Sequence, residues 1–598
     1  MRELIRDTVF SRLAWLADEF SERPALWQGE HKINYRELNE RTNQLACGFL
    51  HEGMKPGSHV AIWGEPDLQL LLMFIALQKL GCVTILLNTC LKYKEAQEQV
   101  VETDTEFMVV GDGYKEIDFL EEMSKMSEDV QRQLKKIIYA GVRQNIPYIG
   151  FNEIVENGET SQEMDLFKRM AAQLQVENPA VMLATSGTTG LKSKLVVLSM
   201  FHLVNGGLQK AEVFKMNTFD IVCMAMPLFH IFCLDVNVMA ALMSGACLYL
   251  PKNRRSREVL RAVQEAKCTV LNAVPSIFYS LLARQEEENY DVSSLRVGMI
   301  GGAYCPPEKF CEIDRKFGFT LIPGLGQTEA AAGIAAAEIA DPLEVRSTTV
   351  GHIVDYMEAR IVNTETQKVL PTGEAGEVCV RGCMLMMGYY KQPELTAESY
   401  DNDGYMHTGD IGYIDGDGYL HMKARIKDLI NRGGEKINPN EIESLIMKDH
   451  RVRSCKVVPV PDEHYGEQAC AVIECKNNQS ITTEEVIDSL KNNLADYKIP
   501  AYVLFVAHIP RTATGKYRQK EIINTCTCKS VGCPVDLEFD CTTGRINALI
   551  VPGPAKFCCF FGHDNEYVIP WNCIRQIGDD IILVEIQEEK CFHKEHLL

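Results

Sequence analysis

The chain lacks a long apolar run, an excess of positive charge and any repeated or low-complexity segment. Its most hydrophobic early stretch, residues 68–81 (LQLLLMFIALQKLG), is shorter than the roughly 20 residues that cross a membrane and is closed by Lys79. The net charge of −21 at pH 7 argues against nucleic acid or an anionic membrane as the main partner, because both would repel the chain. Residues 1–20 lack the apolar core of a signal peptide, so we expect a cytoplasmic protein without a membrane span.

Paired cysteine spacings are also lacking. Most of the 22 cysteines stand singly in apolar stretches, as Cys223 and Cys268 do, which favours small buried side chains in a reducing compartment. Cys526, Cys528 and Cys533 come nearest to a metal motif, but the CxxC pairs of structural zinc sites are absent. Buried thiols are the favoured interpretation, with a metal site as the minor alternative.

The length of 598 residues predicts two to four domains. Residues 36–351 alternate helical and strand-like patterns, which predicts an α/β fold of mainly parallel sheets covered by helices, with ligands at the carboxyl ends of strands. Short strands and turns after Gly351 predict a β-rich subdomain. We expect a large domain over residues 1–426, a small α+β domain over residues 427–520 and a separate small all-β module over residues 521–598.

Local signals fix some element ends in the last two domains. Asn438 and Pro439 have the residue types of an N-cap and a first helical position. Residues 535–553 carry alternating apolar side chains on either side of a Thr-Gly turn, which predicts a β-hairpin.

A loop rich in glycine and hydroxyl groups, TSGTTGLKSK (residues 185–194), lies between two apolar, strand-like runs. Glycines let the backbone approach a phosphate closely, and successive amides and hydroxyls can donate to its oxygens. The spacing is not that of a Walker A loop, because Lys192 follows Leu191 rather than a glycine. Taken alone, the loop is equally compatible with a solvated turn.

Four further motifs follow in order. They are GLGQTEA (residues 324–330), YMHTGDIGYID (405–415), KARIKDLINRGGEKINPNEIE (423–443) and PRTATGKYR (510–518). Together with the loop they resemble the adenylate-forming superfamily of acyl-CoA synthetases, luciferases and peptide-synthetase adenylation domains, over about residues 10–520. The resemblance implies an enzyme that joins a carboxylate to the α-phosphate of ATP, releases pyrophosphate, and then transfers the acyl group to coenzyme A as a thioester.

The resemblance also implies roles for individual residues around ATP and Mg²⁺. Thr328 would contact the α-phosphate, Glu329 would help to hold Mg²⁺, and Asp410 and Arg425 would bind the ribose hydroxyls. The β- and γ-phosphates would be held by Thr185, Ser186, Gly187, Thr188, Thr189 and Gly190, and the adenine would pack on Gly301, Gly302 and Ala303, with Gly326 beside them.

Catalysis and domain movement are implied for the small domain. Lys516 would reach the substrate carboxylate and the α-phosphate, where a cation balances the charge of the transition state. Lys427 would stand at the hinge, and Gly433 and Gly434 would line the pantetheine channel in the second half-reaction. His230 matches a position at the adenylate site, although a packed core histidine is the alternative.

Two departures from the family pattern stand out. The usual loop carries one lysine, and here either Lys194 or Lys192 fits that place depending on the register; we prefer Lys194 as the pyrophosphate contact. Leu325 stands where an aromatic ring usually stacks on adenine, a loss worth about 1 kcal/mol of binding.

The acid is left open by the sequence. The whole chain resembles bacterial carnitine/crotonobetaine-CoA ligases and medium-chain acyl-CoA synthetases, so those acids, other short or branched acids and aromatic acids are candidates. Asp235 could face a quaternary ammonium, but a structural role is the stronger expectation. Loading of a carrier protein instead of coenzyme A, and a catalytically silent scaffold, are the alternative functions.

The C-terminal segment resembles small PRC-barrel proteins of spore-forming bacteria, notably in TGRINALIVPG and EYVIPWNCIRQIGDDIILV. That resemblance implies a short β-barrel and a protein partner that docks on it. A homo-oligomer is a further expectation.

Overall fold

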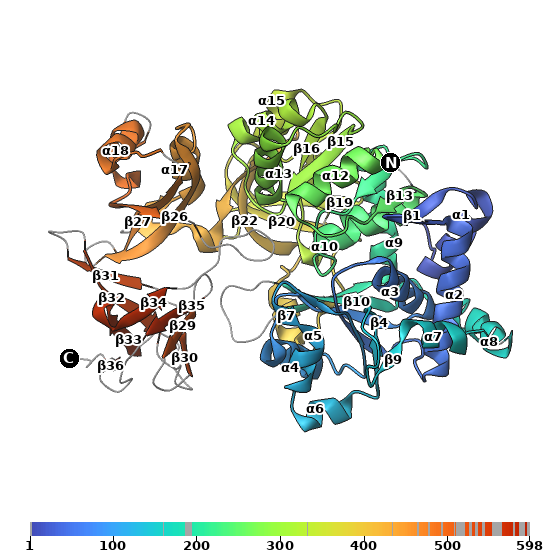
Figure 1. Cartoon of the computed structure of the whole chain (residues 1–598). Helices are drawn as coiled ribbons and strands as arrows, with labels where there is room; N and C mark the ends of the chain where they lie inside the picture. The colour runs from blue at the N-terminus through green and yellow to red at the C-terminus, as the bar shows by residue number, and fades with distance from the viewer. Residues whose placement is uncertain are drawn as a thin grey trace. The chain divides into compact units, whose positions relative to one another are not determined.

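The structure is a computed structural model, and Figure 1 shows the whole chain. It describes residues 3–159, 161–185, 194–331, 333–432, 435–462, 466–476, 479–491, 494–506, 509, 521–524, 529–532, 536–540, 545–552, 565–577, 581–584 and 592–594. The chain divides into two compact units, Met1–Met422 and Lys423–Leu598. No helix in the described part of the chain is both long enough and apolar enough to cross a membrane.

A nine-stranded sheet forms one half of the first unit. Its strands in spatial order are β18 (His352–Ile353), β17 (Ala335–Ala336), β16 (Thr320–Leu325), β15 (Val297–Gly301), β14 (Val270–Leu271), β12 (Ile221–Cys223), β13 (Cys247–Tyr249), β1 (Pro24–Gln28) and β2 (His31–Asn34). The strands from β16 to β1 pair in parallel, and the outer pairs at both edges are antiparallel. Helices α12, α13 and α14 lie along the β12–β16 part of this sheet (Figure 1).

An eight-stranded sheet forms the other half. Its order is β21 (Gly388–Tyr389), β11 (Lys194–Ser199), β10 (Pro179–Thr185), β4 (Val83–Leu86), β3 (His59–Trp63), β5 (Phe107–Val110), β8 (Lys136–Tyr139) and β9 (Ile149–Gly150). The strands from β10 to β9 are parallel, whereas β10–β11 and β11–β21 are antiparallel. The predicted alternation of strands and helices is therefore confirmed as an α/β fold with mixed sheets.

Helices connect these strands. They are α1 (Val9–Glu19), α2 (Tyr35–His51), α3 (Leu68–Leu80), α4 (Tyr93–Glu102), α5 (Phe119–Ser124), α6 (Glu128–Gln133), α7 (Phe151–Asn157), α8 (Ser161–Ala171), α9 (Met200–Val213), α10 (Ile231–Cys233), the π-helix η1 (Leu234–Met239), α11 (Ala240–Ser244), α12 (Ser256–Ala266), α13 (Pro275–Glu287), α14 (Pro307–Phe317), the 3₁₀ turn η2 (Thr328–Ala330), α15 (Leu343–Thr348) and α16 (Pro393–Glu398), with the small hairpin β6 (Gly113–Tyr114) and β7 (Ile117–Asp118).

Helix α3 shows how local sequence sets these bounds. Asp67 accepts a hydrogen bond from the Leu70 amide at 2.8 Å, and Gly81 closes the helix in the left-handed region at φ 84°. Its residues from Leu70 to Leu80 are all buried, so the apolar run noted in the sequence is a core helix.

The stretch after Gly351 forms the predicted β-rich part. Strands β19 (Met357–Val362), β20 (Gly376–Gly382), β22 (Met406–Ile414) and β23 (Leu420–Arg425) make a four-stranded sheet in that order. Strand β23 begins in the first unit and ends in the second.

The second unit opens with a sheet of β25 (Glu435–Ile437), β24 (Ile430–Arg432), β27 (Gly466–Cys475), β26 (Val452–Asp462) and β28 (Tyr502–Val506), with η3 (Ile426–Asp428), α17 (Pro439–Ile446), α18 (Thr483–Lys491) and η4 (Asp496–Lys498). The Asn438 side chain accepts from the Asn440 amide at 3.0 Å and Pro439 is the first helical residue, as predicted. This part is a small α+β domain.

Beyond residue 520 the described elements are strands and one 3₁₀ turn. One sheet holds β30 (Lys529–Gly532), β29 (Glu521–Asn524), β35 (Ile581–Val584) and β34 (Ile574–Ile577), and the other holds β31 (Asp536–Asp540), β32 (Arg545–Pro552), β33 (Asn565–Pro570) and β36 (Phe592–Lys594), with η5 (Trp571–Cys573). Strands β31 and β32 pair antiparallel, so the hairpin prediction is confirmed.

Candidate active site

The two ends of the glycine- and hydroxyl-rich loop are held by strands β10 and β11. Thr185 and Lys194 are register partners, and Thr185 Oγ1 donates to the Lys194 carbonyl at 3.4 Å. The six residues predicted to hold phosphate begin with Thr185; the other five, Ser186, Gly187, Thr188, Thr189 and Gly190, lie outside the described residues, as does Lys192. The loop therefore leaves the sheet at the carboxyl end of β10, where parallel sheets place ligands.

Lys194 and the predicted metal-binding residue Glu329 both contact Tyr389. The Lys194 Nζ atom lies 4.9 Å from the centre of the Tyr389 ring, and the Tyr389 hydroxyl donates to Glu329 Oε1 at 3.0 Å. Strand β21 carries Tyr389 beside β11, with Val196 as its register partner. Burial raises the pKa of Tyr389, and the negative charge of Glu329 raises it further, so this hydroxyl is a donor at neutral pH.

Glu329 is fixed by its backbone as well. It lies in the short turn η2 after Gln327, and its carbonyl accepts from the Met386 amide at 2.7 Å. Thr328 precedes it in the same turn, and Ala331 ends the turn with φ 43°. Tyr389 was not predicted from the sequence; its contact with Glu329 bridges sixty positions along the chain.

Gln327 joins this turn to the predicted ribose-binding residue. Its Nε2 atom donates to Asp410 Oδ2 at 2.7 Å and to the Thr408 carbonyl at 2.9 Å. Asp410 is buried, and its own amide donates to Thr408 Oγ1 at 3.1 Å. The structure thus brings together the motifs around residues 327 and 410, and Gln327 is a connecting residue that the sequence reasoning missed.

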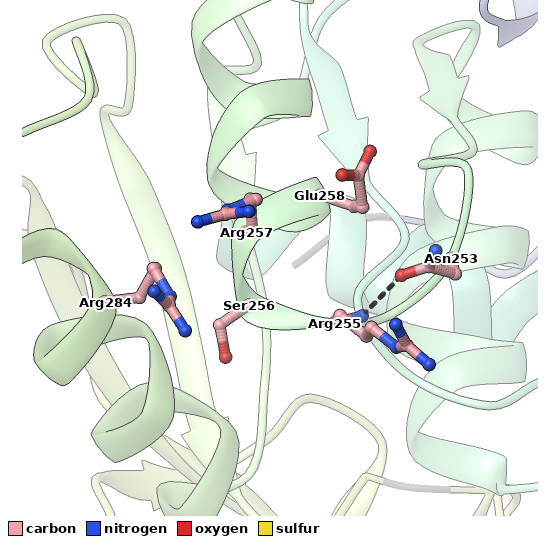
Figure 2. Close-up of a pocket in the computed structure, with 6 residues that line it drawn as sticks. All are labelled: Asn253, Arg255, Ser256, Arg257, Glu258 and Arg284. Carbon is pink, nitrogen blue, oxygen red and sulfur yellow. Dashed lines mark hydrogen bonds between the residues drawn. The ribbon is translucent and has the colours of Figure 1, made fainter. Parts of the chain in front are cut away.

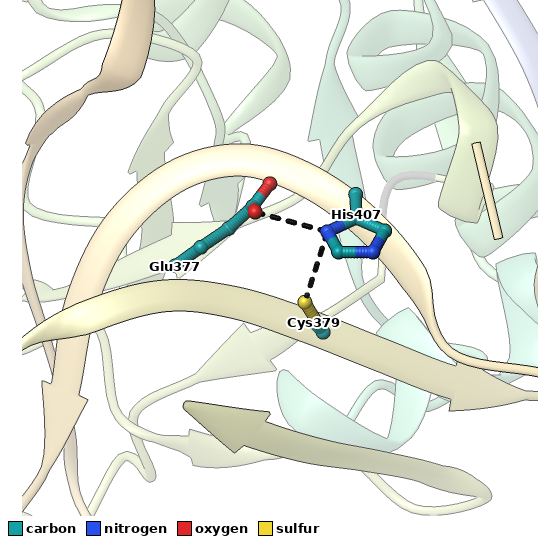
Figure 3. Close-up of side chains that lie close together, drawn as sticks. All are labelled: Glu377, Cys379 and His407. Atoms are coloured by element: carbon teal, nitrogen blue, oxygen red, sulfur yellow. Dashed lines mark hydrogen bonds and ion pairs between the residues drawn. The ribbon is translucent and has the colours of Figure 1, made fainter. Parts of the chain in front are cut away.

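A histidine, a glutamate and a cysteine lie beside the same motif (Figure 3). Glu377 Oε1 accepts from the Gly409 amide at 3.0 Å, and Glu377 Oε2 lies 2.9 Å from His407 Nδ1. Cys379 Sγ lies 3.5 Å from the same nitrogen. Gly409 has φ 72°, a left-handed conformation that favours glycine.

These three side chains have the chemistry of metal ligands, and their contacts also join His407 to strand β20. Burial, followed by the charge of Glu377, raises the pKa of Cys379 to about 12, so the thiol is protonated at neutral pH when no metal is bound. Both oxygens of Glu377 already have hydrogen-bond partners. We read the cluster as a brace for the turn that presents Asp410.

The segment predicted to face adenine ends strand β15. Gly301 pairs with Gly324 on β16, and a Cβ at residue 301 would come within 2.8 Å of the Gly324 carbonyl oxygen. Gly302 has φ 76°, and both Gly302 and Ala303 are exposed. Strand β16 ends at Leu325 and continues into Gly326, so these residues share the carboxyl edge of two neighbouring parallel strands.

His230 stands at the N-cap of α10. Its ring centre lies 4.4 Å from that of Phe229, and its carbonyl accepts from the amides of Cys233 and Leu234, each at 2.9 Å. This packing is compatible with both interpretations of His230 given above.

The predicted residues of the second unit are placed only in part. Arg425 is the last residue of β23 and is exposed, and the side chain of Lys427, in η3, lies outside the description. Gly433 and Gly434 are also outside it, between Arg432 and Glu435, which pair across β24 and β25. Lys516 lies outside the described residues as well.

A surface pocket of about 520 Å³ opens at the start of α12 (Figure 2). It is lined by Asn253, Arg255, Ser256, Arg257, Glu258 and Arg284, none of which the sequence singled out. Two of its arginines are already engaged, because Arg257 Nε and Arg284 Nη1 donate to Glu288 at 3.1 and 3.2 Å. Its positive charge is therefore largely compensated.

Comparison with known proteins agrees with the motifs. The family described as "AMP-binding enzyme" matches residues 13–390, and "AMP-binding enzyme C-terminal domain" matches residues 441–516. The putative acyl-CoA synthetase YngI of Bacillus subtilis is 31% identical over 537 residues, covering 87% of this chain and 97% of that protein. The zebrafish (Danio rerio) mitochondrial medium-chain acyl-CoA ligase ACSF2 is 29% identical over 516 residues, covering 83% and 84%.

Solved structures are also similar. ATP-bound MatB from Rhodopseudomonas palustris has a TM-score of 0.73 at 26% identity, covering 86% of this chain and 97% of that one. The o-succinylbenzoate CoA synthetase MenE of Bacillus subtilis, in complex with its acyl-adenylate intermediate, has a TM-score of 0.72 at 25% identity with the same coverage.

Proposed function

The chain belongs to the AMP-binding enzyme family, as an AMP-forming acyl-CoA ligase of that family, and from this premise we propose how its own residues carry the reaction. A carboxylic acid attacks the α-phosphate of ATP, which forms an acyl-adenylate and releases pyrophosphate. The sulfur of coenzyme A then attacks the acyl carbon, AMP leaves, and a thioester is formed.

One observation carries this proposal: a continuous set of contacts joins the motifs of the first unit. Asp410 binds Gln327, which precedes Thr328 and Glu329, and Glu329 is bound by Tyr389. Lys194 lies over the Tyr389 ring at the mouth of the loop. The residues that we assign to the ribose, the metal and the pyrophosphate are therefore linked by contacts, and Thr328 stands between Gln327 and Glu329 in the sequence.

Glu329 is a suitable ligand for Mg²⁺, because its carboxylate offers hard oxygen atoms and one of them is oriented by Tyr389. The bound ion would neutralise phosphate charge. The protein's own contribution is to hold Thr328 toward the α-phosphate and Asp410 toward the ribose. Lys194 and the loop that begins at Thr185 would stabilise the departing pyrophosphate.

Residues of the second unit complete the scheme. Lys516 would balance charge at the attacked phosphorus, and Arg425 would bind the ribose with Asp410. Rotation about Lys427 would exchange Lys516 for the Gly433–Gly434 turn, which would then line the path of coenzyme A. ATP, Mg²⁺ and coenzyme A are the ligands that this scheme requires.

Several acids fit this scheme. The carnitine and crotonobetaine ligase resemblance favours a small polar acid, and the names of the ACSF2 relatives favour a medium-chain acid. A carrier protein is the alternative acyl acceptor. We also propose that residues 521–598 form a PRC-barrel-like module that binds a protein partner. A further proposal is that identical chains associate.

The test is acid-dependent release of pyrophosphate from MgATP, with and without coenzyme A, across short, medium-chain, aromatic and quaternary-ammonium acids. We expect Glu329→Gln to lower kcat/KM by about 100-fold or more. Exposed Glu338, nine positions later, gives the matched control Glu338→Gln. Lys516→Ala should still bind ATP but should not form the adenylate.

Three other outcomes would change the assignment. Unchanged turnover in Lys516→Ala would remove that residue from the mechanism. Adenylate without thioester would indicate carrier loading. No ATP binding and no release with any acid would favour a silent scaffold.

A further inference from the structure

Two buried charged residues of the first unit have no part in the scheme above. Lys210 on α9 is 2% exposed and Asp235 on η1 is 1% exposed. No ion pair within 4.0 Å joins them, although both belong to the described residues. Burying charge without direct pairing is costly, so the arrangement needs a reason.

Glycines on either side make room for these charges. A Cβ at Gly206, one helical turn before Lys210, would come within 2.6 Å of Asp235 Oδ1. A Cβ at Gly333 would come within 2.5 Å of Lys210 Nζ. The ammonium and carboxylate groups therefore occupy space that ordinary side chains at 206 and 333 would fill.

The hydrogen bonds around the pair are incomplete. Lys210 Nζ donates to Gln209 Oε1 at 2.6 Å. Both carboxylate oxygens of Asp235 are buried and lack a hydrogen-bond partner among the described residues. Buried carboxylates in native proteins nearly always have partners, so the Asp235 oxygens are positions at which an added donor group can bind.

The position of the pair connects it with the proposed site. Asp235 follows His230 by five residues on the continuous run α10–η1, and a π-helix such as η1 often marks a functional position. Gly333, against which Lys210 lies, follows Glu329 by four residues, and its amide donates to the Ala330 carbonyl at 2.8 Å. The pair thus lies between the segments that carry His230 and Glu329.

The electrostatics favour a neutral polar group. Burial raises the pKa of Asp235, an effect that the charge of Lys210 opposes, and burial lowers the pKa of Lys210. Whether the proton sits on the lysine or on the carboxyl, the pair has no net charge. A cationic or anionic group would add an uncompensated charge to a buried place, whereas a hydroxyl can donate to Asp235 and accept from Lys210.

We propose that Lys210 and Asp235 select the acid, and that the substrate class is a carboxylic acid whose carbon skeleton carries a hydroxyl group. This inference rests on the proposed ligase function, because the hydroxyl belongs to the acid that the ligase would activate. Plain hydrocarbon acids leave the Asp235 carboxylate without a donor and give Lys210 no partner beyond Gln209. A site built to bind a hydroxyl rejects such analogues far more strongly than an apolar pocket rejects a hydroxyl.

The experiment compares acids matched in length. Butanoate, hexanoate and benzoate are each paired with hydroxylated forms in which the hydroxyl moves along the skeleton, and a trimethylammonium butanoate is added. Adenylation is followed by pyrophosphate release, and binding by thermal shift of the whole protein with each acid. At the best position we expect kcat/KM for the hydroxy acid to exceed that for its plain partner by about 100-fold or more.

Variants separate selection from folding. Asp235→Asn should reduce the preference for the hydroxy acid by at least about tenfold. Because a single change leaves the other charge buried, the double variant Lys210→Met/Asp235→Leu is the more decisive one, and it should prefer plain acids. Asp220→Asn, at a buried carboxylate already bound by Arg296, should keep the wild-type preference.

Two failures are distinguishable. Turnover with equal preference in wild type and double variant, or a preference for the trimethylammonium acid that Asp235→Asn abolishes, would overturn the hydroxy-acid inference and leave the ligase intact. Absence of turnover together with a thermal shift by hydroxy acids that the double variant loses would support the selecting pair and overturn the ligase.

Discussion

Asp220 and Asp235 are both almost completely buried carboxylates of the first unit, yet their surroundings are opposite. Asp220 is 3% exposed and accepts from Arg296 Nε and Nη2, each at 2.7 Å, and from Thr269 Oγ1, also at 2.7 Å. Asp235 has no such donors among the described residues. The fold supplies hydrogen-bond donors to the Asp220 carboxylate, and the described residues supply none to the Asp235 carboxylate.

Their pKa shifts follow from this contrast. Burial acts to raise the pKa of Asp220, but hydrogen bonds from Arg296 and Thr269 overcome it, and the pKa is lowered. For Asp235 burial prevails and the pKa is raised. A buried charge whose hydrogen bonds are all made within the fold stabilises the protein. A buried charge without hydrogen-bond partners is a candidate for ligand binding.

Breaking the satisfied site should have the largest effect on stability. Asp220→Ala removes the carboxylate partner of Arg296 and leaves only its backbone carbonyl partners, and a buried pair broken in this way costs about 3–5 kcal/mol. Because the Arg296 side chain is 34% exposed and water can screen it, we expect a loss of about 2–3 kcal/mol. Thermal and urea unfolding measure this loss. A change below about 0.5 kcal/mol would show that the pair is not a stabilising one.

Replacing the incomplete pair should have the opposite sign. Lys210→Met/Asp235→Leu exchanges buried charges for apolar groups, and such exchanges stabilise proteins by about 1–4 kcal/mol. We expect a gain of about 2 kcal/mol in the same unfolding experiments. A loss of stability would mean that the pair contributes to folding, and the contrast with Asp220 would disappear.

Glu377 offers an intermediate case, a buried carboxylate whose partners serve the site. Glu377→Gln weakens its hold on the Gly409 amide and on His407, which loosens the turn before Asp410. We expect KM for ATP to rise about tenfold with a smaller change in kcat, consistent with the loss of a charge-assisted hydrogen bond. Glu358→Gln, which alters an exposed glutamate on the same sheet, is the control; equal effects of both would refute the bracing role.

The pH dependence of stability sharpens the contrast further. The pKa of Asp235 is raised in the folded state. Its stabilising contribution to folding is therefore complete below the ordinary pKa of 3.8, and it is lost as the pH rises through the raised pKa. For Asp220 the folded pKa is lowered, so its contribution is present above 3.8 and is lost as pH falls through the lowered value. The pKa of Lys210 is lowered in the folded state, so its stabilising contribution, like that of Asp220, is lost as the pH falls through the lowered pKa.

As pH falls from about 7 to about 5, the free energy of unfolding of wild type should therefore rise by about 1 kcal/mol relative to that of the Lys210→Met/Asp235→Leu variant. Its advantage over Asp220→Asn should stay constant across that range and shrink only under more acidic conditions. Parallel curves for the two comparisons would contradict the opposite pKa shifts.

The smallest effect is expected at Tyr389. Tyr389→Phe removes one hydrogen bond to Glu329, worth about 1 kcal/mol, so kcat/KM should fall about fivefold. Raised Mg²⁺ should restore much of the loss if the tyrosine orients the metal ligand. Tyr390→Phe is a matched control, because that hydroxyl donates to Asp104 at 2.7 Å instead. Identical Mg²⁺ dependence in both variants would remove Tyr389 from the site.

The contrast also shows what the sequence reveals. Helix α3 could be predicted from its apolar run, residues 68–81, because those residues are adjacent in the chain. The motif residues Thr328, Glu329 and Asp410 were found because their neighbours form family patterns. These signals are local, so they survive without knowledge of the fold.

The residues that were missed act across distance in the chain. Gln327 reaches Asp410 over 83 positions, and Tyr389 reaches Glu329 over 60. Lys210 looks like any helical lysine in the sequence, and its burial depends on α9 packing against η1. Tertiary contacts of this kind leave no periodic or compositional trace.

Gly333 has a consequence for how this enzyme could diverge. The Lys210 ammonium lies within 2.5 Å of the point where a methyl group at residue 333 would begin. One codon change to alanine would displace the flexible end of the lysine and change its position relative to Asp235. The substrate preference that we propose for Lys210 and Asp235 can therefore change in evolution while the residues around Glu329 stay the same.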